Sequence, residues 1–177
     1  MIDRVELRNS QPDDEPCITE LYRSAFPDED LLPLVTSLLR EGVDVLSLVA
    51  IADQKPVAHA IFTSCTIDAA TEKVALLGPL AVCTQWQRKG IGRKIVQAGF
   101  ETLRSTGTTQ VFVLGDPAYY GRLGFRPEHQ VSPPYALPDI WRNAWQTLRH
   151  SEVRQPTQGT LNVPAPWRQK SLWLPAE

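Results

Sequence analysis

The sequence predicts an α/β fold with a mixed, mostly antiparallel central sheet flanked by helices. Three strand-like segments, at residues 46–52, 57–67 and 73–82, follow one another with short polar connections, which is typical of an antiparallel meander. An amphipathic helical pattern at 90–106 then leads to a short apolar segment at 110–114 of the buried, parallel kind. The resulting order, β-α-α-β-β-β-α-β-α-β, favours helices packed on a sheet.

The N-terminal segment contributes the first strand and two helices. Residues 4–8 alternate in polarity, as a strand with one buried face does. Ser10 is predicted to open a helix whose first turn is acidic, and Pro27 ends it. Its apolar residues have the spacing of one buried helical face: Ile18, Leu21, Tyr22, Ala25 and Phe26. A second helix follows over residues 31–38 and ends near Gly42.

The C-terminal segment has a different composition. A short helix around 118–123 leads to a strand that begins at Phe125, and beyond Val131 the chain is rich in proline and carries four of the five tryptophans. We expect only a helix at about 139–149 and a strand around 160–163 there. The predicted organisation is a core of residues 1–130 and a Pro/Trp-rich extension, 131–177, packed on the same domain.

Composition excludes several classes of function. A net charge of −2 over 177 residues gives no reason to expect nucleic acid or a membrane surface as a partner. The three cysteines are widely spaced and match neither a metal-binding pattern nor a disulfide framework. The first residues form no apolar leader, and the sequence has no run of about 18 apolar residues. We therefore expect a cytoplasmic protein without a metal site.

The strongest chemical feature is the passage from the strand at 73–82 into the helix at 90–106. Gly90 and Gly92 permit a tight turn, and the first amides of a helix lack partners within the helix and lie at its positive end. Such a turn binds anions, and a pyrophosphate fits it. The basic residues around it are Arg88, Lys89, Arg93 and Lys94.

Two other phosphate-binding turns fit the sequence less well. A P-loop requires Lys and then Ser or Thr after its second glycine, whereas Arg93 and Lys94 follow Gly92. A dinucleotide-binding fingerprint requires a third small residue where Ile95 stands. The spacing of Gln87, Gly90 and Gly92 instead matches the pattern Q/R-x-x-G-x-G/A.

Two motifs carry a resemblance to a known family. The run LGPLAVCTQWQRKGIGRKIV at 77–96 resembles the acetyl-CoA-binding strand, turn and helix of the GNAT superfamily of N-acetyltransferases. The run LGDPAYYGRLGF at 114–125 is similar to that superfamily's closing element and, more narrowly, to a bacterial branch of predicted acetyltransferases. The resemblance covers about residues 1–130. It implies acetyl-CoA as cosubstrate and a V-shaped splay between the parallel strands 73–82 and 110–114.

The resemblance also implies roles for individual residues. The pantetheine arm would pair with the strand at Leu80, Ala81 and Val82, with the Val82 amide at the thioester oxygen. The coenzyme's remaining contacts would come from Gln87, Arg88, Lys89, Gly90, Ile91, Gly92, Arg93, Asp116 and Tyr120. Tyr120 would also act as the general acid that protonates the departing thiolate, since a phenol is protonated at neutral pH. One departure is Val113, which stands where the family commonly carries a cofactor-contacting Asn.

The general base is less well defined. Gly78 and Pro79 are expected to interrupt pairing in the strand at 73–82. Glu29, at the start of the second helix, and His59, in the strand beside this interrupted one, are the candidates, and a chain of waters is the alternative. Each also has a structural interpretation: Glu29 as a partner of the helix dipole and His59 as a buried structural histidine. No cysteine is placed with a histidine as a nucleophile, so direct attack without a covalent enzyme intermediate is expected.

The sequence thus predicts an acetyl-CoA-dependent N-acyltransferase that acts on an amine. A non-catalytic acyl-CoA sensor and an interaction domain built on the Trp-rich tail are the alternatives. The acceptor, a small molecule or a peptide, and the oligomeric state, with a homodimer among the options, stay open.

Overall fold

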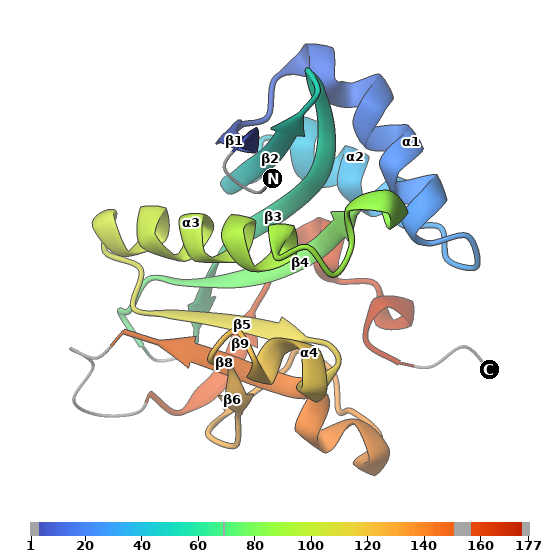
Figure 1. Ribbon diagram of the computed structural model, residues 1–177. Helices are drawn as coiled ribbons and strands as arrows, with labels where there is room; N and C mark the ends of the chain where they lie inside the picture. Colours follow the sequence, from blue (N-terminus) through green and yellow to red (C-terminus); the bar gives the residue numbers. More distant parts are fainter. Residues whose placement is uncertain (1–3, 69, 151–156, 175–177) are drawn as a thin grey trace. The chain divides into compact units, whose positions relative to one another are not determined.

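The computed structural model describes residues 4–68, 70–150 and 157–174 (Figure 1). The chain divides into two compact units. The first contains residues 1–62 and 77–102, and the second contains 63–76 and 103–177. Strands β3 (Lys55–Ile67) and β4 (Val74–Val82) run through both units, so each unit includes part of each strand. The domain boundary expected at residue 130 stays a prediction.

The first unit is built on four neighbouring strands in the order β1-β2-β3-β4. Strand β1 (Glu6–Asn9) pairs antiparallel with β2 (Val45–Ala52). Asp53 and Gln54, with φ of 48° and 63°, form the two-residue turn from β2 into β3. A turn this short joins antiparallel neighbours, as the meander prediction requires.

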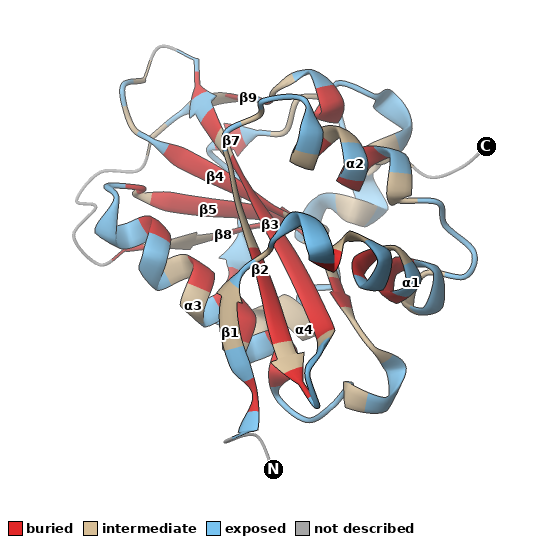
Figure 2. Cartoon of the chain, turned by 90° about the horizontal axis from the view of Figure 1, so that it is seen from above, coloured by how far each residue is buried: buried red, intermediate tan, exposed pale blue. Residues whose placement is uncertain are grey.

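Helices cover both faces of these strands. Figures 1 and 2 show α1 (Glu15–Ala25) and α2 (Leu32–Arg40) on one face and α3 (Ile91–Ser105) on the other. The buried residues of α1 are the apolar ones that the sequence pattern picks out at positions 18, 21 and 22. The helix predicted from Ser10 begins later than expected. A 3-10 turn, η2 (Pro12–Asp14), precedes it, and the Ser10 hydroxyl is bonded to Ser47 Oγ at 2.6 Å instead of capping a helix.

Helix α3 lies very close to β3. A Cβ atom built on Gly99 would come within 2.2 Å of the Phe62 ring, so only glycine fits at this contact. The Phe62 side chain is 1% exposed and Gly99 is also buried. This approach holds the helix that starts at the glycine turn against the sheet.

The second unit continues the two shared strands in the order β3-β4-β5-β8-β6. Strand β5 (Gln110–Leu114) is parallel to β4, and this register extends from Val74↔Gln110 to Leu76↔Phe112. Its other edge pairs antiparallel with β8 (Trp145–Arg149). The remaining elements are α4 (Pro117–Gly121), β6 (Arg126–Pro127), β7 (Val131–Ser132), η4 (Asp139–Ala144), β9 (Gly159–Asn162), which pairs with β3 and β7, η5 (Ala165–Trp167) and η6 (Lys170–Leu172).

The helix predicted at about 139–149 is wrong over its second half. Residues 139–144 form a 3-10 helix, but 145–149 form strand β8. The β5 edge needs backbone partners, and Trp145 stacks on Phe112 of β5 with ring centroids 5.3 Å apart. Pairing and aromatic packing therefore override the local helical pattern. The strand expected around 160–163 is confirmed as β9.

The tryptophans of the C-terminal segment form part of the core of the second unit. Trp145, Trp167 and Trp173 are 3%, 8% and 1% exposed. Each indole N–H has a partner: the carbonyl of Val131 for Trp145, the Thr63 hydroxyl for Trp167, and the Trp167 carbonyl for Trp173. Buried indoles with satisfied donors indicate structural packing.

Gly99→Ala should lower the free energy of unfolding by about 1–3 kcal/mol, because the added methyl must displace the Phe62 ring from a packed core. Urea titration followed by circular dichroism measures the change. Gly121→Ala is the control, since a methyl there meets nothing within 4 Å, and it should be neutral or stabilising. Equal stability of Gly99→Ala and the wild type would contradict the close packing described here.

Candidate functional site

The turn between β4 and α3 leaves a row of backbone donors unused. After η3 (Thr84–Trp86), Arg88 and Gly90 adopt positive φ angles of 58° and 79°. The amides from Arg88 through Gly92 have no hydrogen-bond partner within the described chain, whereas Lys94 N–H already donates to Gly90 O at 3.0 Å. Left-handed residues at a helix N-terminus orient successive amides into a concave anion-binding surface. The local chemistry fits a diphosphate.

Several side chains around this turn make contacts within the protein, and Arg88 is exposed at its surface. Gln87 Nε2 donates to Val82 O at 3.0 Å and closes the loop. Lys89 Nζ lies 5.1 Å from the centre of the Trp86 ring, as in a cation–π contact. Lys94 Nζ donates to Val5 O at 2.9 Å, so this amine contacts the backbone just before β1. Arg88 is exposed, which leaves its charge accessible at the turn.

One edge of β4 is left unpaired by β5. The register with β5 ends at Leu76, although β4 continues to Val82. Cys83 N–H donates to Val57 O at 2.8 Å, toward β3. Because backbone groups alternate along a strand, those of Leu80 and Val82 face the opposite edge. The Gln87 bond to the Val82 carbonyl agrees with this orientation.

A buried chain of hydrogen bonds joins β3 to β4 through α1. His59 on β3 is 0% exposed. Its Nδ1 lies 3.0 Å from the Tyr22 hydroxyl, and its Nε2 lies 2.8 Å from Ser47 Oγ. The Tyr22 hydroxyl also donates to Pro79 O at 3.3 Å, and Ser47 contacts the hydroxyl of Ser10. Both ring nitrogens of His59 are therefore engaged inside the protein.

The acceptors in this chain fix the proton positions. A carbonyl can only accept, so the single hydroxyl proton of Tyr22 goes to Pro79 O. The Tyr22 oxygen then accepts from His59 Nδ1–H, and in a neutral imidazole Nε2 accepts from the Ser47 hydroxyl. His59 is neutral in this arrangement and carries its proton on Nδ1.

Burial lowers the pKa of His59 to about 4, and the nearby carboxylate of Asp14 partly opposes this shift. Asp14 itself is held by two bonds from Arg8, at 2.7 and 2.8 Å, which lower the pKa of that carboxyl. A neutral His59 is thus the stable form at physiological pH. As a general base His59 stays a prediction, and the geometry gives it instead a part in a closed structural chain.

Glu29 lies in the connection between α1 and α2, with its amide donating to Phe26 O at 3.3 Å. It lines a surface pocket of about 530 Å³ together with Tyr22 and the neighbouring acids Asp28 and Asp30. Arg23 is the basic residue in this lining. A surface with three carboxylates favours a cationic molecule.

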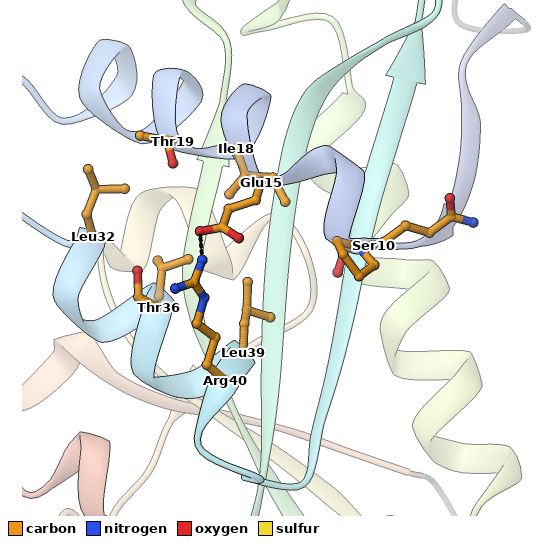
Figure 3. Close-up of a pocket in the computed structure, with 11 residues that line it drawn as sticks. Ser10, Glu15, Ile18, Thr19, Leu32, Thr36, Leu39 and Arg40 are labelled. Carbon is orange, nitrogen blue, oxygen red and sulfur yellow. Dashed lines mark hydrogen bonds and ion pairs between the residues drawn. The ribbon is translucent and has the colours of Figure 1, made fainter.

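A second pocket, of about 250 Å³, lies between α1 and α2 (Figure 3). An ion pair between Glu15 of α1 and Arg40 of α2 spans it, and Ser10 lies at its edge. The pair lowers the pKa of Glu15 through its bond from Arg40. None of the residues that the sequence predicts for the site lines this pocket.

Asp116 and Tyr120 belong to the second unit. Asp116 Oδ1 accepts from Ala118 N–H at 2.8 Å and caps α4. The Tyr120 ring packs edge-on against Phe125, with centroids 5.6 Å apart. A Cβ at Gly115 would lie 2.4 Å from the Tyr120 ring, so glycine is required there as well. These contacts hold the tyrosine in one orientation.

The hydroxyl of Tyr120 has no hydrogen-bond partner among the described residues, and the side chain is half-buried. Burial raises the pKa of Tyr120 above its ordinary value. A phenol in these surroundings remains protonated at neutral pH and is free to donate.

Sequence reasoning missed two members of the buried chain. Tyr22 reads in sequence as one more apolar residue on the buried face of α1, and Ser47 as one polar residue in a strand. The hydrogen bonds of both hydroxyl groups connect segments that are far apart in the chain, so no local sequence pattern predicts them. Their polarity at buried or half-buried positions is the one signal that could have singled them out.

Neither a membrane-spanning helix nor a metal-binding cluster is present among the described residues. No helix there is long and apolar enough to cross a membrane. No group of three or more His, Cys, Asp or Glu side chains in the same residues is arranged to hold a metal ion.

Wild-type stability should fall as the pH drops from 6.5 to 4, because the unfolded chain protonates His59 in this range and the folded chain does not. The free energy of unfolding should lose about 1 kcal/mol per pH unit from this residue. Denaturation of the wild type and of His59→Gln at several pH values measures the effect. The slope of the unfolding free energy against pH should be smaller in the variant by the amount that corresponds to the uptake of about one proton. Parallel slopes would contradict a buried neutral histidine.

Comparison with known proteins identifies the family. Residues 15–125 match the model of the Acetyltransferase (GNAT) family. The uncharacterized N-acetyltransferase YjhQ of Escherichia coli is 34% identical over 153 residues, covering 82% of this chain and 83% of that protein. The uncharacterized N-acetyltransferase YhbS of the same organism is 35% identical over 127 residues, covering 71% and 73%.

Solved structures agree with this family. The crystal structure of the E. coli GNAT family N-acetyltransferase YhbS in complex with CoA has a TM-score of 0.85, with 26% identity over 94% of this chain and 93% of that one. A GNAT family acetyltransferase from Brucella melitensis in complex with acetyl-CoA has a TM-score of 0.73, with 27% identity over 92% and 97%. The glycine turn, the β4 edge released by β5 and these similarities together show that the chain belongs to the GNAT family and is an N-acetyltransferase.

Proposed function

We propose that this protein transfers an acetyl group from acetyl-CoA to an amine by direct attack. The observation that carries the proposal is the row of amides from Arg88 through Gly92, which the fold leaves without partners at a helix N-terminus. Relatives of this fold were crystallised with CoA and with acetyl-CoA, which supports the same ligand here.

We assign the binding of the diphosphate to the amides of the turn. Its negative charge is balanced by the basic side chains of Arg88, Lys89 and Arg93. The pantetheine arm is assigned to the β4 edge at Leu80 and Val82, as a short strand addition. The Val82 amide then donates to the thioester oxygen, where negative charge develops during acyl transfer. Ala81 lies between them in the strand. Gln87 supports this edge by holding the Val82 carbonyl.

The chemistry then requires proton transfers at nitrogen and at sulfur. The bound ammonium gives one proton to a base, its neutral nitrogen bonds to the acetyl carbon, the carbon–sulfur bond breaks, and the nitrogen releases its second proton to solvent. The thiolate takes a proton from the Tyr120 hydroxyl, whose raised pKa keeps it protonated until charge develops on sulfur. Asp116 is proposed to contribute by fixing the start of α4, from which Tyr120 projects.

We place the acceptor amine at the pocket lined by Asp28, Glu29 and Asp30. Three carboxylates attract an ammonium group, and Glu29 is the proposed base that receives its proton once it is bound. The LGDPAYYGRLGF element also favours membership of the narrower bacterial branch of acetyltransferases that share it.

Gly90→Val should abolish measurable acetyl-CoA binding, because a β-branched side chain at a φ of 79° distorts the turn and crowds its amides. Isothermal titration calorimetry measures the affinity. Gly107→Val is the matched control, since Gly107 has a φ of 87° and open space around it but lies after the end of α3. Binding by Gly90→Val as tight as by the control would overturn the proposal.

Tyr120→Phe should lower the acetylation rate by about 100-fold or more while leaving acetyl-CoA affinity unchanged, because the ring packing is kept and only the proton donor is lost. Steady-state assays with a panel of amines, together with calorimetry, separate the two quantities. Tyr119→Phe is the control and should retain activity. A Tyr120→Phe enzyme with full turnover would exclude Tyr120 as the acid, and a wild type that binds without turnover would indicate a sensor.

Glu29→Gln should reduce kcat/KM for the amine about tenfold or more, because the neutral amide neither attracts an ammonium group nor takes its proton. The control is Glu41→Gln, an exposed glutamate just beyond α2. If the two variants show the same kcat/KM in the amine assay, Glu29 is neither base nor acceptor contact.

A further inference from the structure

The hydroxyl chain buried under α1 ends at the strand that is proposed to bind pantetheine. Tyr22 is 1% exposed, and its hydroxyl contacts Pro79 O, one residue before Leu80. Pro79 has no N–H of its own, so this segment of β4 lacks one backbone bond that other strand residues make. The tyrosine supplies a bond from a helix at the point where the strand is weakened.

His59 determines which way the Tyr22 hydroxyl points. Its Nδ1–H donates to the tyrosine oxygen, so the hydroxyl proton is directed at Pro79 O. Ser47 occupies the other ring nitrogen and is in turn contacted by Ser10, at the edge of the pocket in Figure 3. Phe26 stacks on the Tyr22 ring at a centroid distance of 6.0 Å. The hydroxyl therefore has one orientation, fixed from both sides.

On the β5 side, this segment of β4 has no paired strand to support it. The β5 register stops at Leu76, and the backbone groups of Leu80 and Val82 face the edge that β5 does not pair. A strand edge without a partner keeps its shape only if other contacts hold it. Tyr22 supplies a side-chain hydrogen bond to the backbone of this segment, at Pro79 O.

We infer that Tyr22, oriented by His59, is a positioning residue that fixes β4 at Pro79 so that the next residues present their amides to the pantetheine arm. The inference deepens the proposed function and depends on it. It assigns His59 a task that needs neither exposure nor a change of protonation. Tyr22 touches no reacting atom in this scheme.

The test separates the two halves of coenzyme A by calorimetry. Coenzyme A itself contacts both the glycine turn and β4, whereas 3′-phosphoadenosine 5′-diphosphate carries the diphosphate and lacks pantetheine. Tyr22→Phe keeps the ring and removes the bond to Pro79 O. It should raise the Kd of coenzyme A about tenfold, the effect of one hydrogen bond, and change the Kd of the truncated nucleotide less than twofold.

Matched variants distinguish positioning from general damage. Tyr135→Phe removes another tyrosine bond to a backbone carbonyl, that of Arg168, and should leave both Kd values unchanged. His59→Asn keeps an N–H near the Nδ1 position and should behave like the wild type. His59→Leu fills similar space without a donor and should reproduce Tyr22→Phe. If Tyr22→Phe does not fold, the two His59 variants decide the question.

Three results would overturn the inference. In the first, Tyr22→Phe or His59→Leu binds both probes with wild-type affinity. In the second, either variant raises the Kd of both probes by the same factor. In the third, His59→Asn and His59→Leu have the same Kd values. A wild-type protein that binds neither probe would instead refute the proposed function. The two failures are therefore told apart in the same experiment.

Discussion

The interaction on which the rest of the structure depends is the parallel pairing of β4 with β5, and above all its end at Leu76. Up to this residue, β4 is an ordinary buried strand with partners on its edges. Beyond it, the strand runs on for six residues to Val82 with the β5-side edge unpaired, and the chain then turns into α3. Backbone donors that a compact protein normally satisfies internally thus remain available at the edge of the strand and at the start of the helix.

Keeping such an edge ordered requires support from other parts of the fold. Helix α3 is held against β3 by the contact of Gly99 with Phe62. On the opposite face, α1 contributes the Tyr22 hydroxyl to the backbone of β4, and β3 contributes His59 to orient it. The two faces of β3 therefore make different contacts: one packs its apolar side chain against α3, and the other forms hydrogen bonds. This division follows from the alternation of side chains along a strand.

The predictions succeeded where local chemistry decides the outcome. Segment 110–114 is a fully apolar strand, and β5 has the predicted bounds. The glycine turn, the start of α3 and the strand near residue 160 are also confirmed, because glycine spacing and hydrophobic period act over a few residues. The prediction failed at 145–149, where Trp145 and the open edge of β5 impose a strand on a sequence with a helical pattern. It also placed the first helix too early, because the Ser10 hydroxyl is used by Ser47.

The sequence by itself determined the family, the order of the elements as far as β5 and the position of the glycine turn. Each of these depends on residue types at fixed short spacings, as in the segment from Gln87 to Gly92. The tertiary structure alone decided the state of His59 and the contacts of Tyr22. Burial lowers the pKa of that histidine, and its two hydrogen-bond partners, Tyr22 and Ser47, come from separate segments. Contacts between residues that are distant in sequence depend on how the whole chain packs, so a local sequence pattern does not predict them.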